Sequence, residues 1–152
     1  MRSITPNLWF DDTLEQAFAF WAEVFGDEAE VVSINHGPDG KVLTGEMTIH
    51  GQRVLGLNGG PQFVLSEAFS FFVECDDQAE VDRLWDALTA DGGEPSMCGW
   101  LKDRFGVSWQ IIPSQFIELM SSGTPEQVQR AFDAMLGMRK LDVAQLHAAW
   151  AG

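Results

Sequence analysis

The sequence is poor in positive charge. Nine lysine and arginine residues stand against 23 aspartate and glutamate residues, which gives a formal net charge of −14. A surface of this sign repels nucleic-acid phosphates and anionic lipid head groups, so we expect neither nucleic acid nor membrane as a partner. The same acidity is also explained without any partner, because net charge keeps proteins soluble.

Long apolar runs and cysteines are scarce as well. No run approaches the ~20 apolar residues that a membrane-spanning helix needs, and no apolar core of a signal peptide follows Arg2. Cys75 and Cys98 lie far apart, and without an export signal we expect both to stay reduced. These absences predict a cytoplasmic protein.

What is present is typical of one globular domain. The chain has 152 residues, of which 45% are hydrophobic and 21% charged. This size and composition allow a sizeable core. We therefore predict a single domain over residues 1–152.

The first half of the chain predicts a strand, a helix and three more strands, over residues 3–60. Pro6 marks the start or the edge of a strand, and Asp12 with Glu15 has the spacing of a capping box. Apolar residues then follow at helical spacing up to Gly26, which ends the helix. The predicted strands are 4–10, 30–35, 41–50 and 53–57, with turns at 37–40 and 51–52.

The second half repeats this order over residues 66–114. A strand is predicted at 69–75, and a helix follows it. Asp77 and Glu80 have the spacing of a capping box at the start of this helix, and Gly92-Gly93 ends it. A hairpin is predicted at 97–112. Asp12 precedes Trp21 by the same interval as Asp76 precedes Trp85, which indicates an internal duplication. The pattern predicts an α+β fold of two modules, each made of a strand, a helix and further strands.

A C-terminal helical extension is expected over residues 115–152. Thr124-Pro125 and Asp142 are typical helix starts. The apolar stripe of the two helices is either an interface of a homodimer or a cover for the chain's own sheet. It comprises Phe132, Leu136, Leu146 and Trp150.

Four segments of the sequence are distinctive: Thr5 to Phe10, Phe20-Trp21, Leu57 to Gly60, and Cys98 to Gln110. Together they resemble one family, the PhnB-like proteins, also labelled 3-demethylubiquinone-9 3-methyltransferase-like. These belong to the vicinal-oxygen-chelate (glyoxalase/bleomycin-resistance) superfamily. The resemblance therefore implies that superfamily's α+β fold, in which two βαβββ modules form a cupped mixed sheet. The resemblance extends over nearly the whole chain, the closing helices included.

The resemblance implies a divalent metal site on the strands, but the residues do not suit one. The family's ligand positions fall near Asn7, near Ser70 and at Gln110, and none of these is an imidazole or a carboxylate. His36, His50 and His147 have no chelating spacing. We therefore expect neither a bound metal nor another cofactor. The methyltransferase label implies S-adenosylmethionine, yet no Gly-rich turn follows the first strand.

The expected binding residues line a cavity with aromatic walls and uncharged hydrogen-bonding groups, which suits a planar or apolar small molecule. The alternative is that the tryptophans only pack in the core or a dimer interface. The candidates are Asn7, Trp9, Ser70, Phe72, Trp100, Trp109 and Gln110.

Other polar residues have simpler explanations. Lys102, Asp103 and Arg104 are expected to be solvated at a hairpin tip, or to form an anion clamp at the cavity mouth. Cys98 is interpreted as an inert buried thiol. Asp11, Asp12, Asp76 and Asp77 are explained by helix capping.

Two functions stay open. The first is a small-molecule-binding protein of the glyoxalase-like family without a bound metal. The second is an enzyme on a small organic substrate, either a methyltransferase or a metal-dependent isomerase or lyase.

Overall fold

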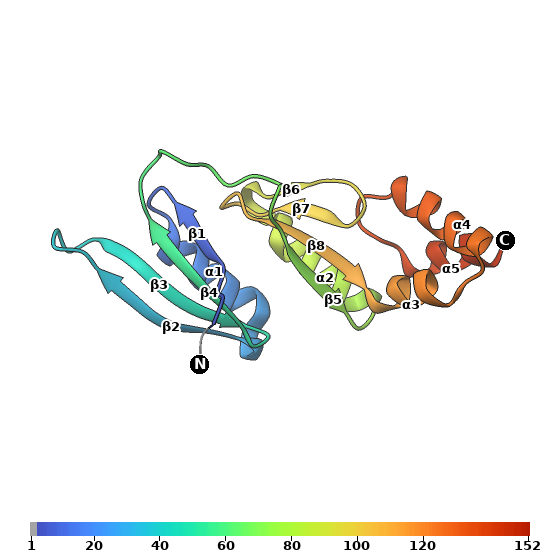
Figure 1. Cartoon of the computed structure of the whole chain (residues 1–152), viewed down its shortest axis with the longest axis horizontal. Helices are drawn as coiled ribbons and strands as arrows, with labels where there is room; N and C mark the ends of the chain where they lie inside the picture. The colour runs from blue at the N-terminus through green and yellow to red at the C-terminus, as the bar shows by residue number, and fades with distance from the viewer. Residues whose placement is uncertain (1–2) are drawn as a thin grey trace. The chain divides into compact units, whose positions relative to one another are not determined.

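The computed structural model describes residues 3–152, which form two compact units. Unit 1 ends at Leu65, and unit 2 runs from Ser66 to Gly152. Each unit contains a four-stranded mixed sheet with a helix against one face (Figure 1), so the predicted α+β class and the two modules are confirmed. Within the described residues, no helix is long and apolar enough to cross a membrane.

Unit 1 contains sheet A, in the strand order β1-β4-β3-β2. β1 is parallel to β4, and the other neighbours are antiparallel. Helix α1 packs on one face, where alternate strand residues such as Leu8, Met47 and Val54 are buried. The elements are β1 (Asn7–Phe10), α1 (Leu14–Phe25), the 3₁₀ turn η1 (Gly26–Glu28), β2 (Ala29–His36), β3 (Val42–Ile49) and β4 (Gln52–Asn58).

Unit 2 contains sheet B, in the order β5-β8-β7-β6, with β5 parallel to β8. Helix α2 contacts β5, β7 and β8 and buries Val81, Leu84, Trp85 and Leu88. The elements are β5 (Phe71–Cys75), α2 (Gln78–Thr89), the 3₁₀ turn η2 (Ala90–Gly92), β6 (Glu94–Pro95), β7 (Trp100–Lys102) and β8 (Ser108–Pro113).

The predicted duplication is visible in the two long helices. α1 begins at Leu14 and α2 at Gln78, and both have 12 residues, so each position of α1 has a counterpart 64 residues later. Trp21 and Trp85 are both buried at equivalent positions. The two modules therefore use one helix in the same way against their own sheets.

The cap of α1 differs from the prediction. Thr13 occupies the N-cap position without a side-chain cap, and the N–H of Leu14 donates instead to Oδ1 of Asn58 at 3.0 Å. Asp12 is therefore not the cap, and the donor is satisfied from the end of β4. α2 follows the prediction more closely, because Asp77 accepts from the N–H of Glu80 at 2.9 Å.

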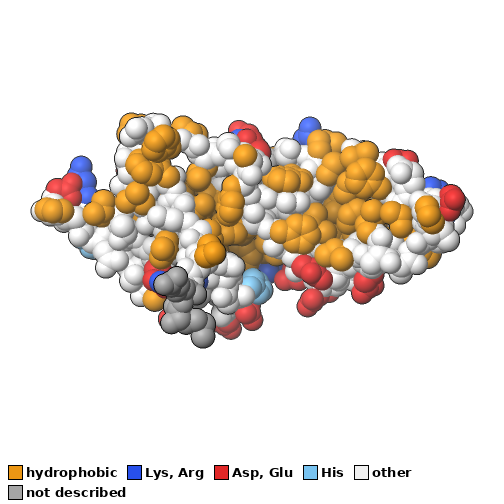
Figure 2. Space-filling model, in the orientation of Figure 1, with side chains coloured by type: hydrophobic (Ala, Val, Ile, Leu, Met, Phe, Trp, Pro, Cys, Tyr) orange, Lys and Arg blue, Asp and Glu red, His pale blue; other side chains and the backbone are white. Residues whose placement is uncertain are grey.

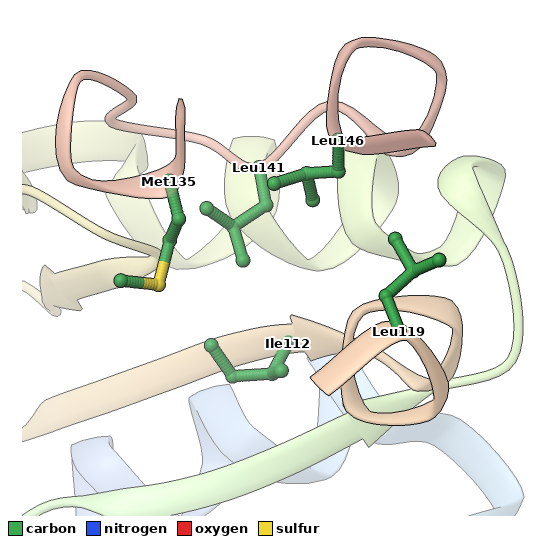
Figure 3. Close-up of a cluster of buried hydrophobic side chains, with 5 residues drawn as sticks. All are labelled: Ile112, Leu119, Met135, Leu141 and Leu146. Atoms are coloured by element: carbon green, nitrogen blue, oxygen red, sulfur yellow. The ribbon is translucent and has the colours of Figure 1, made fainter. Parts of the chain in front are cut away.

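The C-terminal extension has three helices, one more than expected. α3 (Ser114–Ser122) follows β8 directly and was missed, whereas α4 (Pro125–Leu136) and α5 (Val143–Ala151) begin at the predicted caps Thr124 and Asp142. One buried apolar cluster joins all three helices to sheet B (Figure 3). It comprises Ile112, Leu119, Met135, Leu141 and Leu146.

Backbone hydrogen bonds attach the extension to the loop between β6 and β7. The N–H of Cys98 donates to the carbonyl of Met138 at 2.7 Å, and that of Gly99 to Arg139 at 2.8 Å. Gly99 has a φ of +82°, and a Cβ there would lie 2.8 Å from the Ile112 side chain. Only glycine combines this backbone conformation with such close packing. The extension is thus an integral part of unit 2.

Candidate functional site

The face of sheet B that is turned away from α2 carries a row of three predicted residues. The register places Phe72 of β5 beside Gln110 of β8, and Gln110 beside Trp100 of β7. Phe72 is 55% exposed, while Trp100 and Gln110 are half-buried. In Figure 2 hydrophobic side chains gather over this part of unit 2. We call this surface the open face of sheet B.

A hollow of about 320 Å³ lies over this row. The strands of sheet B supply the row of three residues and Ile112, and the loop before β7 supplies Cys98. The other four lining residues belong to α3 and α4. None of the nine lining residues is an aspartate, glutamate, lysine or arginine. The lining residues are Phe72, Cys98, Trp100, Gln110, Ile112, Phe116, Ile117, Met120 and Met135.

Ser70 supports the polar group of this pocket. The amide Nε2 of Gln110 donates to Oγ of Ser70 at 2.9 Å. Ser70 and Gln110, the two family ligand positions in the second module, are therefore neighbours in the structure. Within residues 3–152, no protein group donates a hydrogen bond to the amide oxygen of Gln110, and amide oxygens accept readily.

Trp109 does not share this face. Adjacent residues of a strand point to opposite sides, so Trp109 lies on the α2 side of β8 when Gln110 lies on the open face. Trp109 is 1% exposed, and its ring lies 4.9 Å from that of Phe71. The expectation that Trp109 lines the cavity together with Gln110 is wrong.

Asp103 is likewise not the solvated residue that was expected. It is 2% exposed, and its carboxylate accepts from the N–H groups of Phe105 and Val107 and from Nε1 of Trp109. Lys102 pairs with Glu67 at 2.6 Å and Arg104 with Asp91 at 3.1 Å. Asp103 therefore organises the β7–β8 turn, and the three residues do not form one charged patch.

Asn7 and Trp9, the binding candidates of unit 1, lie on the face of sheet A that is turned away from α1. Asn7 is exposed, and Trp9 is half-buried with its Nε1 donating to the carbonyl of Gly60 at 2.8 Å. A Cβ on Gly59 would collide with the Trp9 ring, so glycine is required there. Trp9 thus anchors the segment that leaves β4. The structure brings Ser70, Phe72, Trp100 and Gln110 together, and it holds Asn7 and Trp9 in the other unit.

The donor set does not fit a divalent transition metal. Ser70 and Gln110 offer a hydroxyl and a carboxamide, and they are hydrogen-bonded to each other. Glu46 lies in the same row of sheet A as Asn7, but Arg53 pairs with it and lowers the pKa of its carboxyl through a hydrogen bond. Across residues 3–152, no group of three or more His, Cys, Asp or Glu side chains is placed to hold a metal ion.

Comparison with known proteins defines the family. The sequence profile of the 3-demethylubiquinone-9 3-methyltransferase family matches residues 2–112. The chain belongs to this family. The match ends at Ile112, before α3 begins, so the expectation that the family resemblance includes the closing helices is wrong. The curated proteins gave no match.

Solved structures from three bacteria are similar to this chain in fold. The PhnB protein from Bacillus cereus is 29% identical with a TM-score of 0.67, and the match covers 74% of this chain and 99% of that one. Protein PA1353 from Pseudomonas aeruginosa is 21% identical with a TM-score of 0.60, covering 74% and 98%. The E126Q mutant of the fosfomycin resistance protein FosX from Listeria monocytogenes, complexed with Mn(II), is 16% identical with a TM-score of 0.55, covering 72% and 90%.

Part of the pocket was not predicted from the sequence. Phe116, Ile117 and Met120 lie on α3, a helix for which Pro113 provides no side-chain cap. The spacing of Phe116, Leu119 and Met120 is the signal that identifies this helix. Met135 of α4 also lines the pocket, and it was not among the binding residues expected from the sequence.

Proposed function

We propose that the protein binds a neutral, weakly polar small molecule on the open face of sheet B and does so without a divalent metal. The observation that carries the proposal is the pocket beside Gln110. Its volume of about 320 Å³ lies at the lower end of the range for small-molecule sites. Its walls are aromatic and aliphatic, and Gln110 supplies the hydrogen-bonding group.

The charge of the pocket supports a neutral ligand. A buried ionic group needs a partner, because its transfer from water is costly. The lining has no acidic or basic side chain apart from the thiol of Cys98. The net charge of −14 further disfavours anions.

Native mass spectrometry with elemental analysis tests the metal-free part of this proposal. We expect the purified protein to contain no stoichiometric zinc, nickel, manganese or iron, because Asn7, Ser70 and Gln110 are neutral. About one metal ion per chain, lost in Gln110→Leu, would favour the alternative of a metal-dependent enzyme on a small organic substrate.

An NMR titration of ¹⁵N-labelled protein with benzamide tests the binding site. Benzamide combines an aromatic ring with a neutral amide, so we expect shifts at Phe72, Trp100 and Gln110. Gln110→Leu keeps the size of the side chain and removes one hydrogen bond, which should weaken binding about two- to tenfold. The matched control is Gln52→Leu, because Gln52 is exposed on β4 of unit 1. Equal affinity in both variants, or no shift at the pocket, contradicts the proposal.

A further inference from the structure

The wall of the pocket is a feature of this chain's extension. The family match ends at Ile112, and the similar structures align with 72–74% of this chain while being covered over 90–99% of their own length. α3 begins at Ser114 and supplies Phe116, Ile117 and Met120, and α4 supplies Met135. These four side chains therefore come from outside the family match.

The pocket has a polar group on the sheet and an apolar side where the extension lies. Along β8, the residues of the open face alternate, so Gln110 is followed by Ile112. Gln110 is bonded to Ser70, whereas Ile112 is 5% exposed within the cluster that the extension covers. The hydrogen-bonding group thus lies on the sheet, and the apolar wall lies where the extension meets it.

The segment between α4 and α5 attaches the extension to the rest of unit 2. Besides the backbone bonds of Cys98 and Gly99, the side chain of Gln78 on α2 donates to the carbonyl of Leu141 and accepts from the N–H of Val143. Lys140 pairs with Asp82 of α2 at 2.8 Å. These attachments fix the extension that carries the wall, and a pre-formed wall lowers the entropy cost of binding.

From these observations we infer that the extension selects ligands with an aliphatic or aromatic tail. The tail lies against Phe116, Ile117 and Met120, and a neutral polar head meets Gln110. This inference rests on the proposed function and adds a specificity element to it. Met120 is well suited to this role, because an unbranched thioether adapts to different apolar shapes. It lines the pocket and is not part of the buried cluster, so its substitution spares the core.

The test compares benzamide with 4-ethyl- and 4-butylbenzamide on the full chain, by the same NMR titration. Each methylene that is buried against the wall should raise affinity about fourfold, so the butyl compound should bind at least about tenfold more tightly than benzamide. Met120→Gln should remove most of this gain, so that benzamide and the butyl compound bind with similar affinity. Met120→Leu should retain the gain, and so should Met97→Gln, which makes the same change at an exposed residue that does not line the pocket.

The outcomes separate the two proposals. If benzamide does not bind at the pocket, the proposed function fails. If benzamide binds there but the butyl compound binds no better, the inference is wrong and the proposed function stands. A gain that persists in both Met120→Gln and Phe116→Ser also overturns the inference, because the tail then lies elsewhere.

Discussion

The indole Nε1 of Trp109 donates a hydrogen bond to the buried carboxylate of Asp103 at 2.9 Å. The same carboxylate accepts from the N–H of Phe105 at 2.9 Å and from that of Val107 at 3.1 Å. One side chain thus fixes the β7–β8 turn and the orientation of a large core residue. This arrangement explains why Trp109 packs inside unit 2 and leaves Gln110 to face the pocket.

Asp103→Ala should therefore lower the free energy of unfolding by about 3 kcal/mol, because three donors lose a charged acceptor in a buried turn. Urea denaturation measures this change. Asp39→Ala is the matched control, since Asp39 accepts one exposed bond from the N–H of Lys41, and it should change stability by less than about 1 kcal/mol. An equal loss of unfolding free energy in the two variants would contradict the structural role assigned to the buried carboxylate of Asp103.

The cap of α1 gives a second stability prediction. Asn58→Ala should cost about 1 kcal/mol, because the N–H of Leu14 loses its acceptor. Asp12→Ala should have little effect, since Asp12 is exposed and does not occupy the N-cap. Thermal unfolding of both variants decides between the capping residue seen in the structure and the one that the sequence suggested.

Stability should fall at alkaline pH because of Cys75. Burial of this thiol, and then the charge of Glu80, raise its pKa to about 12. In the unfolded chain a cysteine has a pKa near ~8.5, so the unfolded state loses a proton that the native state keeps. This contribution is fully present below about pH 8.5 and is lost progressively as the pH rises toward 12. Urea denaturation at pH 8 and pH 10.5 should show a smaller decrease in Cys75→Ala than in the unsubstituted protein.

We predict that S-adenosylmethionine does not bind with useful affinity. Its carboxylate would need free donors at a helix N-terminus. At α1 the N–H of Leu14 is already bonded to Asn58, and the exposed carboxylates of Asp11 and Asp12 lie beside it. Titration calorimetry should detect no micromolar binding. Micromolar affinity that Gln110→Ala abolishes would show instead that the methyltransferase description of the family applies to this chain.

We also predict a homodimer, through the part of the tail stripe that stays exposed. Leu146 is 0% exposed and lies in the chain's own cluster, whereas Phe132 and Leu136 of α4 are 40% and 49% exposed. Burial of such side chains in a partner surface stabilises association. Light scattering at micromolar concentration should give the mass of two chains, and Phe132→Glu with Leu136→Glu should shift it to one. A monomeric unsubstituted protein would contradict this prediction.

Most of the architecture was predictable because it depends on local patterns. The apolar spacing from Leu14 to Phe25, the stop at Gly26 and the caps Asp77 and Thr124 are all confirmed. The cap of α1 was not predictable, because Asn58 is 44 residues from its partner. Helix α3 was missed because it follows β8 at Pro113 without a side-chain cap.

The site was predictable only in part, for a related reason. Strand alternation correctly groups Ser70 with Phe72, but the sequence does not show which of Trp109 and Gln110 faces the helix. Trp109 is oriented toward the helix by its hydrogen bond to Asp103, six residues earlier in the chain. The sequence does not indicate this bond, because charged residues near a turn ordinarily lie in solvent. The apolar wall depends on tertiary packing of the extension, which no local pattern reveals.

The extension also affects the order in which the two units can be completed on the ribosome. All strands of sheet A precede Leu65, so unit 1 has its full set of elements early in synthesis. Ile112 cannot be buried in its cluster until Leu141 and Leu146 have been synthesised, which takes about two to seven seconds more at ordinary rates of translation. During that interval the open face of sheet B presents uncovered apolar surface to solvent or to a chaperone. The nascent chain, more than the finished protein, is therefore the species most prone to aggregate.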